Sequence, residues 1–231
     1  MKAPETINVF IGYDPVETVS FHTMVQSLIE YSSKPLNIHP VNIRNYKDIY
    51  FRKKDPKQSN EFSFSRFLVP YLMNYRGFGI FFDCDMMLRD DVTKIFDNID
   101  ENKAVSVVKH SYLPRDDIKY LDNVQYSYPR KNWSSVVVWN CGHPKNKELD
   151  LNFINTKSGL ELHRFSWLDD YDIGELDVTW NWLVGEYDNP PENVKNVHWT
   201  IGGPYFKEFR DVDFSEEWRQ MHQLINFCKQ R

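Results

Sequence analysis

The sequence has 231 residues, which is enough for one α/β domain with a substantial core, and we expect a single domain over residues 1–231. Its formal net charge of −5 argues against a general nucleic-acid binder or a binder of anionic membranes, because both normally carry a basic excess. Three cysteines that cannot all pair, no signal-peptide pattern and no apolar run long enough to span a bilayer predict a soluble, cytoplasmic protein.

Strands and helices alternate in the first part of the chain. Residues 7–11 are rich in β-branched side chains and predict a buried strand, which ends at a Gly-Tyr-Asp-Pro turn. Residues 15–31 carry apolar side chains at helical spacing. Residues 36–43 alternate as a second strand, and Pro40 assigns that strand to an edge or to an interruption. The chain therefore begins as strand, helix, strand.

The rest of the chain continues this alternation. The apolar stripe over residues 62–72 predicts a helix in which Pro70 causes a kink or a later start. A long connection with Tyr112, Tyr120, Tyr126 and Tyr128 is typical of functional or mobile loops. The other expected elements are strands at 104–108, 136–139 and 194–199 and helices at 149–154 and 214–228. The pattern predicts an α/β fold with a mostly parallel central sheet flanked by helices.

The most informative stretch is 78–85, where an apolar run ends at Asp83 and Asp85. The run predicts a buried central strand, and ligands of open α/β sheets bind beyond the carboxyl ends of such strands. Two carboxylates about 4 Å apart repel each other by roughly 4 kcal/mol at an effective dielectric constant near 20. We therefore expect a cation between them, and a hard divalent ion with oxygen ligands is the leading candidate.

Four motifs along the chain form a larger pattern: Ile11-Gly12-Tyr13-Asp14, Ser63-Phe64-Ser65-Arg66-Phe67-Leu68-Val69-Pro70-Tyr71-Leu72, Phe82-Asp83-Cys84-Asp85 and His198-Trp199-Thr200-Ile201-Gly202-Gly203-Pro204. Together they resemble the GT-A nucleotide-sugar glycosyltransferases, especially those related to glycosyltransferase family 8. The resemblance implies a GT-A fold and a metal held on the donor diphosphate by Asp83, Asp85 and His198. An imidazole among the ligands favours Mn²⁺, with Mg²⁺ as the alternative.

The resemblance also implies where the donor binds. Tyr13 and Asp14 lie in the turn that such enzymes use for the nucleoside, for which uridine is expected. Glycines at 202–203 would let backbone amides approach phosphate oxygens. Arg66 would lie beside the nucleotide-sugar and the metal motif, with pairing to an acid of that motif as the structural alternative. The expected nucleotide-sugar-binding residues are Ile11, Gly12, Tyr13, Asp14, Arg66, Asp83, Cys84, Asp85, Ser135, Gly202 and Gly203.

The residues that face the transferring sugar and the acceptor are predicted less directly. Asp170 is the first candidate and Asp169 the second, because the surrounding aromatic segments resemble a region that faces the sugars; a solvated loop is the alternative. We count Arg66 with them as the third expected catalytic residue. Lys109 and His110 directly follow a predicted strand and are further candidates for the cleft.

These residues predict a metal-dependent glycosyltransferase that moves a sugar from a UDP-sugar donor to a glycan or another hydroxyl acceptor. The resemblance implies retention at the anomeric carbon. A haloacid-dehalogenase-like phosphohydrolase is an alternative, because its nucleophile motif is also an apolar strand followed by Asp-x-Asp, although Met86-Met87 replaces the expected Gly-Thr pair. A non-catalytic sugar-binding module is a second alternative, favoured by the aromatic content of 16%.

Overall fold

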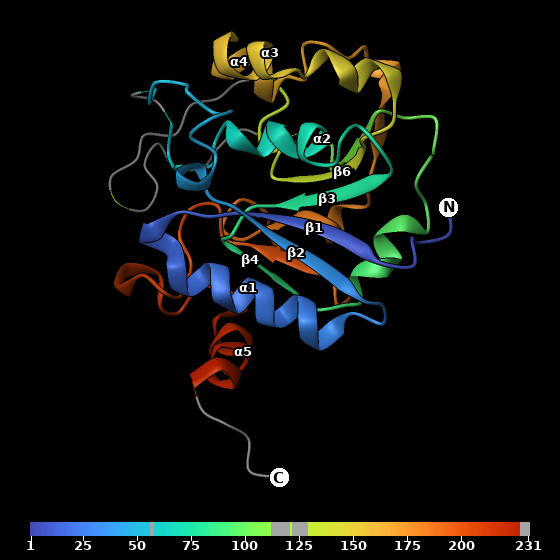
Figure 1. Ribbon diagram of the computed structural model, residues 1–231. Coiled ribbons are helices and arrows are strands. Elements are labelled where there is room, and N and C mark those ends of the chain that lie inside the picture. The colour runs from blue at the N-terminus through green and yellow to red at the C-terminus, as the bar shows by residue number, and fades with distance from the viewer. Residues whose placement is uncertain (56–57, 112–120, 122–128, 227–231) are drawn as a thin grey trace.

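The computed structural model describes residues 1–55, 58–111, 121 and 129–226 (Figure 1). Cys228 and the four tyrosines of the predicted long connection lie outside these residues. Within them, a six-stranded sheet with the order β2-β1-β3-β6-β5-β7 forms the centre. One face of this sheet carries α1 (Thr18–Tyr31), and the other carries α2, α3 and α4 (Figure 1). None of the helices in these ranges is both long and apolar enough to cross a membrane.

The first half of the sheet is parallel. β1 (Ile7–Gly12) pairs with β2 (Leu36–Val41) on one side and with β3 (Phe78–Phe82) on the other. β2 lies at the edge of the sheet, as the proline within it predicts. β1 and β3 are buried because both faces of the sheet are covered, which explains their almost uninterrupted apolar sequences.

The second half contains one strand that runs against the others. β6 (Val136–Asn140) lies antiparallel between β3 and β5 (Val105–Val107), and β7 (Ile173–Glu175) then pairs parallel with β5. The sheet is therefore mostly parallel, as predicted, with β6 as the exception. β3, β5 and β7 run in the same direction, so their carboxyl ends lie at the same edge of the sheet.

The helices of the second layer are short. The stripe 62–72 begins as a 3₁₀ turn (Ser65–Leu68) and continues as α2 (Val69–Leu72), so Pro70 lies at the start of the helix, where its missing amide is harmless. α3 (Leu151–Thr156) confirms the predicted helix near residue 150. α4 (Gly159–His163) was not expected, although its capping box of Ser158 and Glu161 is visible in the sequence.

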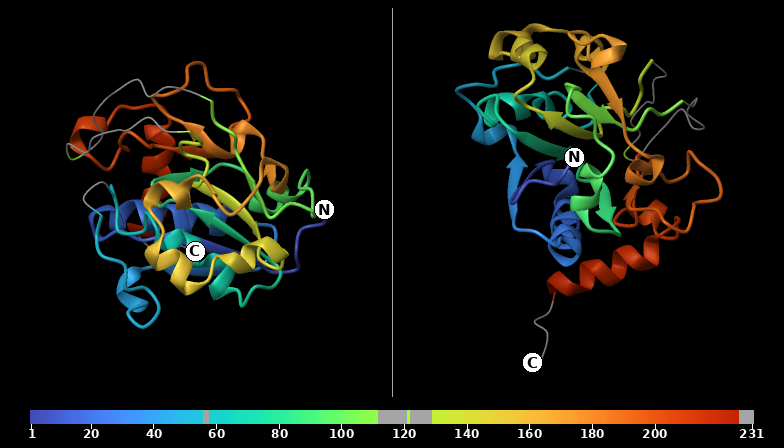
Figure 2. Two further views of the ribbon diagram at one scale, coloured as in Figure 1. Left: turned by 90° about the horizontal axis from the view of Figure 1, so that it is seen from above. Right: turned by 90° about the vertical axis from the view of Figure 1, so that its right-hand side faces the viewer.

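A second, three-stranded sheet supports the functional site. It consists of β4 (Met86–Leu88), β9 (Asn196–His198) and β8 (Trp182–Leu183), in the order β4-β9-β8. β4 and β9 pair antiparallel in a register that sets Met86 opposite His198. α5 (Ser215–Asn226) packs against α1 below this sheet (Figure 2). The buried side chains between them form a second core cluster: Met87, Trp182, Val184, Val194, Val197, Trp199, Trp218 and Met221.

Candidate functional site

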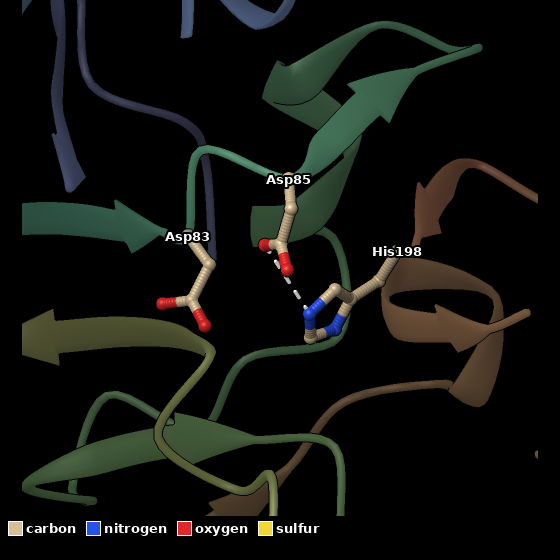
Figure 3. A group of neighbouring side chains, drawn as sticks. All are labelled: Asp83, Asp85 and His198. Carbon is tan, nitrogen blue, oxygen red and sulfur yellow. Dashed lines mark ion pairs between the residues drawn. The ribbon is translucent and has the colours of Figure 1, made fainter. Parts of the chain in front are cut away.

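Two carboxylates and one imidazole converge beyond the carboxyl end of β3 (Figure 3). Asp83 and Asp85 follow β3 directly, and His198 ends β9. One ligand atom from each of the three lies within 4.8 Å of the others, and the residues are only 7%, 7% and 1% exposed. These three residues are called the acid–histidine cluster below. The predicted convergence of distant side chains is present in the structure.

Backbone contacts hold the cluster together. The register of β4 and β9 brings His198 next to Asp85, and the amide of Trp199 donates to the Asp85 carbonyl at 3.0 Å. On the other side of the turn, the Asp83 amide donates to the Ser135 carbonyl at 3.0 Å. The two acids are therefore fixed through their own backbone atoms, and the Asp85 carboxylate points toward the imidazole (Figure 3).

An asparagine orients the imidazole. Asn181 Oδ1 lies 2.9 Å from His198 Nδ1, while Asn181 Nδ2 donates to Ser135 Oγ at 2.8 Å. Because the Asn181 amide nitrogen faces Ser135 Oγ, the amide oxygen faces the imidazole, and His198 Nδ1 must carry the hydrogen. His198 Nε2 then faces Asp85 Oδ1 at 3.3 Å. A second partner that fixes the ring and its tautomer is the usual arrangement for a histidine that binds metal through its other nitrogen.

The charge balance of the cluster favours a divalent cation. Arg66 contributes one positive charge, with Nη1 2.7 Å from Asp83 Oδ1. Its guanidinium lies 5.3 Å from the ring centroid of Phe62 and 5.1 Å from that of Phe81. One guanidinium balances only one of the two buried carboxylates, and His198 Nε2 adds a nitrogen donor. Two oxygen donors and one nitrogen donor could hold a divalent cation here, and Mn²⁺ stays the predicted ion.

The turn predicted to bind the nucleoside has structural partners. A Cβ on Gly12 would lie 2.3 Å from the Phe62 ring, so glycine is needed there for packing. Asp14 Oδ1 accepts from the amide of Val16, and its Oδ2 accepts from the amide of Glu61, both at 2.9 Å. The Tyr13 hydroxyl lies 3.2 Å from Thr18 Oγ1. Asp14 therefore caps the following turn and joins it to a second backbone segment, and a nucleoside contact for it stays a prediction. Ile11, the first residue of this motif, is fully buried within β1.

The segment after His198, although distant in the sequence, contacts the residues that follow β1. Rings from its own sequence fill the space next to both glycines: a Cβ on Gly202 would lie 2.4 Å from Phe209, and one on Gly203 2.3 Å from Tyr205. The Tyr205 hydroxyl donates to Glu17 Oε1 at 3.1 Å. Intramolecular packing thus explains the two glycines, and a phosphate contact for them stays a prediction.

Two further predicted donor residues are also engaged within the protein. Cys84 is fully buried, and burial raises the pKa of its thiol, which fits a packing residue. Ser20 Oγ donates to the Cys84 carbonyl at 2.8 Å and so ties the turn to α1. Ser135 Oγ donates to the Asn132 carbonyl at 2.6 Å and accepts from Asn181. Ser135 therefore supports the orientation of His198.

Asp169 and Asp170 lie elsewhere. They directly precede β7, at the amino end of that strand, whereas the acid–histidine cluster follows the carboxyl end of the parallel strand β3. Asp169 pairs with Lys145 at 2.7 Å, and Asp170 pairs with Arg130. The Asp170 side chain is 90% exposed. The structure therefore does not bring these two acids to the cluster.

The two candidates after β5 differ in position. His110 is buried, with Nδ1 2.7 Å from the Tyr187 hydroxyl. Burial, together with the effect of the nearby His198, lowers the pKa of His110 to about 3. The Lys109 ammonium lies 5.9 Å from the Trp133 ring centroid. A place for His110 or Lys109 in a substrate cleft stays a prediction.

A substitution at Gly12 tests the packing explanation for the first turn. Gly12→Ala is expected to lower the free energy of unfolding by about 2 kcal/mol, because the added methyl overlaps the buried Phe62 ring. Urea denaturation measures this change. Gly142→Ala is the matched control, since its Cβ would lie 3.8 Å from the nearest atom, and it should change the stability by less than about 0.5 kcal/mol. Equal effects of the two substitutions would contradict the explanation.

Solved glycosyltransferases have a similar fold. WbbM, a bifunctional glycosyltransferase, matches 95% of this chain with a TM-score of 0.66 and 14% identity. GlyE of Streptococcus pneumoniae TIGR4 matches 96% with a TM-score of 0.64 and 14% identity. The galactosyltransferase LgtC, in complex with donor and acceptor sugar analogues, matches 97% with a TM-score of 0.62 and 9% identity. The matched region is 50%, 61% and 98% of those three chains, respectively. The protein thus has a GT-A glycosyltransferase fold, as predicted.

Sequence comparison adds a closer relative. Protein CDI of Arabidopsis thaliana is 42% identical over 217 residues, which are 91% of this chain and 83% of CDI. No family model matches the sequence. The chain therefore belongs to the family of the Arabidopsis protein CDI. Its relation to glycosyltransferase family 8 stays a prediction.

Proposed function

We propose that the protein transfers a sugar from a nucleotide-diphosphate donor, a UDP-sugar, to a hydroxyl group of a glycan or another acceptor. The observation that best supports this proposal is the acid–histidine cluster, which is buried and lies beyond the carboxyl end of β3 in a GT-A fold. Ligands of open α/β sheets bind at that edge. The proposal includes metal dependence, with Mn²⁺ preferred over Mg²⁺ because of the imidazole donor.

Each side chain has a role in this proposal. Asp83, Asp85 and His198 Nε2 would hold the divalent ion, which when bound supplies positive charge to the leaving diphosphate. Arg66 would donate to a diphosphate oxygen, since it is 5% exposed and its Nε has no hydrogen-bond partner among the residues that the structure describes. Asn181 keeps the imidazole in the required tautomer. Positioning and electrostatics would then supply most of the catalysis.

The proposed transfer retains the configuration of the anomeric carbon, as the family resemblance implies. The acceptor oxygen forms its bond to this carbon on the face from which the diphosphate departs. The bond between the carbon and the diphosphate oxygen breaks, and the acceptor proton passes to the departing diphosphate. No protein nucleophile is required for this route, and none is assigned.

The two alternative functions have less support. The GT-A fold does not favour a haloacid-dehalogenase-like phosphohydrolase, and Asp83 is engaged by Arg66. Six of the seven tryptophans are buried, so the tryptophans give little support to a sugar-binding module. The buried six are Trp139, Trp167, Trp180, Trp182, Trp199 and Trp218.

Thermal denaturation with combinations of ligands tests the proposed function. A ligand present at 100 times its dissociation constant stabilises the folded state by about 2.7 kcal/mol, which raises the melting temperature by about 5 °C or more in a chain of this size. We expect this rise with UDP and MnCl₂ together, and a much smaller rise with either alone. ADP and GDP serve as controls for the base, and EDTA as the control for the metal.

Other outcomes would assign a different function. Stabilisation by oligosaccharides that needs neither nucleotide nor metal would favour the sugar-binding module. A covalent acyl phosphate on Asp83 after incubation with phosphorylated compounds would favour the phosphohydrolase. Equal melting temperatures with and without every nucleotide–metal pair would contradict the glycosyltransferase proposal.

A further inference from the structure

Ser134 and Ser135, called the serine pair below, contact both sides of the acid–histidine cluster. The Ser134 carbonyl accepts from Arg66 Nη1 at 2.9 Å, and the same nitrogen contacts Asp83. The Ser135 carbonyl accepts from the Asp83 amide. Ser135 Oγ accepts from Asn181, which orients His198. A shift of this pair would therefore disturb Asp83 and His198 together.

His163, a side chain of α4, forms a hydrogen bond with the serine pair. His163 Nδ1 lies 2.7 Å from Ser134 Oγ, a hydrogen bond that forms whichever of the two atoms donates. The His163 ring lies against Phe64 and Phe67, with centroid distances of 5.7 and 5.4 Å. Burial, together with the charges of Arg66 and Arg52, lowers the pKa of His163 to about 3, so the ring is neutral at pH 7. A neutral ring adds a hydrogen bond here without adding charge beside Arg66.

This contact has a geometric consequence. Ser134 precedes β6 and has little strand pairing of its own, because the ladder with β3 begins at Val136. The direction of its carbonyl therefore depends on the side-chain anchor as well as on the adjacent strand. If Ser134 rotated, Arg66 would lose one acceptor and would no longer be held in register with Asp83.

We propose that His163 is a positioning residue for the acid–histidine cluster, acting through the hydroxyl of Ser134 and the guanidinium of Arg66. The inference rests on the proposed function, because it assigns to His163 a part in binding the metal–diphosphate pair. His163 touches none of the three cluster residues in the contacts described above. In this proposal its effect on ligand binding passes through Ser134.

A set of four variants isolates that path. His163→Phe keeps a ring between the phenylalanines but removes the hydrogen bond, and Ser134→Ala removes the hydroxyl but keeps the carbonyl. The double variant combines them. His163→Asn restores a polar group near the position of Nδ1. His222→Phe is the matched control, because His222 also contacts a hydroxyl, Thr23 Oγ1 at 3.2 Å, but lies on α5.

The first readout is Mn²⁺ binding in the presence of UDP, which is measured through the electron paramagnetic resonance signal of the free ion. His163→Phe and Ser134→Ala should each weaken Mn²⁺ binding by about 10-fold, as supporting residues of metal sites do. The double variant should be no weaker than either single variant, because both remove the same contact. His163→Asn should bind nearly as well as the wild type, and His222→Phe should bind equally well. Wild-type affinity in His163→Phe, or multiplied effects in the double variant, would overturn the inference.

Crystal structures of the wild type and His163→Phe give a second readout that needs no ligand. The hydrogen bond from Arg66 Nη1 to the Ser134 carbonyl should be lost in the variant, and its retention would overturn the inference. If the wild type bound no Mn²⁺ with UDP, the proposed function would fail, while this structural comparison would still decide the role of His163. Melting temperatures of all variants show whether each protein is folded.

Discussion

Replacing Asp85 by asparagine is expected to reduce metal-dependent sugar transfer by at least about 10³-fold, which corresponds to about 4 kcal/mol of lost transition-state stabilisation. The substitution removes a charged ligand and changes the volume of the side chain little. Donor turnover, followed as UDP release with and without MnCl₂, measures the effect. The increase in melting temperature caused by UDP and Mn²⁺ should disappear in parallel.

The same variant should fold at least as well as the wild type in the absence of metal. The Asp85 carboxylate lies 3.3 Å from His198 Nε2 and is buried with a second carboxylate. An amide at this position removes one negative charge and offers a donor to the imidazole nitrogen, so the melting temperature should stay equal or rise. Asp211→Asn, in the exposed Asp-x-Asp pair before α5, is the control and should change neither property. Unchanged turnover of Asp85→Asn at saturating Mn²⁺ would refute the metal assignment.

Arg66→Met is expected to lower the free energy of unfolding by about 3 kcal/mol, because it leaves the buried Asp83 carboxylate without its cation. Methionine keeps an unbranched stem between the rings of Phe62 and Phe81, so most of the packing is preserved. Urea denaturation without added metal measures the change. Turnover should also fall, because Arg66 would no longer donate to the diphosphate.

A surface ion pair provides the control for this prediction. Arg44 pairs with Glu61 at 3.3 Å, and its side chain is 60% exposed. Arg44→Met should therefore change the free energy of unfolding by less than about 1 kcal/mol. If Arg66→Met were as mild as Arg44→Met, the burial of the Arg66–Asp83 pair would not have the energetic importance assigned to it here.

The main strands can be predicted from the sequence because burial on both faces leaves a continuous apolar run, as in β3. The short strands β4, β7 and β8 were missed, since two or three residues carry no period. Their existence depends on pairing with distant segments, such as that of β4 with β9. The antiparallel direction of β6 was also not visible in its local sequence.

The candidate site, like the short strands, depends partly on contacts that a local sequence pattern does not reveal. Asp83 and Asp85 follow from a local pattern, and His198 follows from the family resemblance. The supporting roles of Asn181 and His163 arise from contacts between distant elements, which no local spacing reveals. Asp14 shows a further limit, because an acid after a strand can bind a nucleoside or cap the next turn; the structure shows the cap, and a nucleoside contact stays a prediction.

Diffraction from crystals grown with MnCl₂ and UDP tests the central claim most directly, because anomalous scattering locates manganese without assumptions about the ligands. The account predicts one strong peak bonded to a carboxylate oxygen of Asp83, a carboxylate oxygen of Asp85 and Nε2 of His198, with diphosphate oxygens on its other side. A peak bonded elsewhere, or an imidazole turned away from two acids that bind no ion, would contradict it.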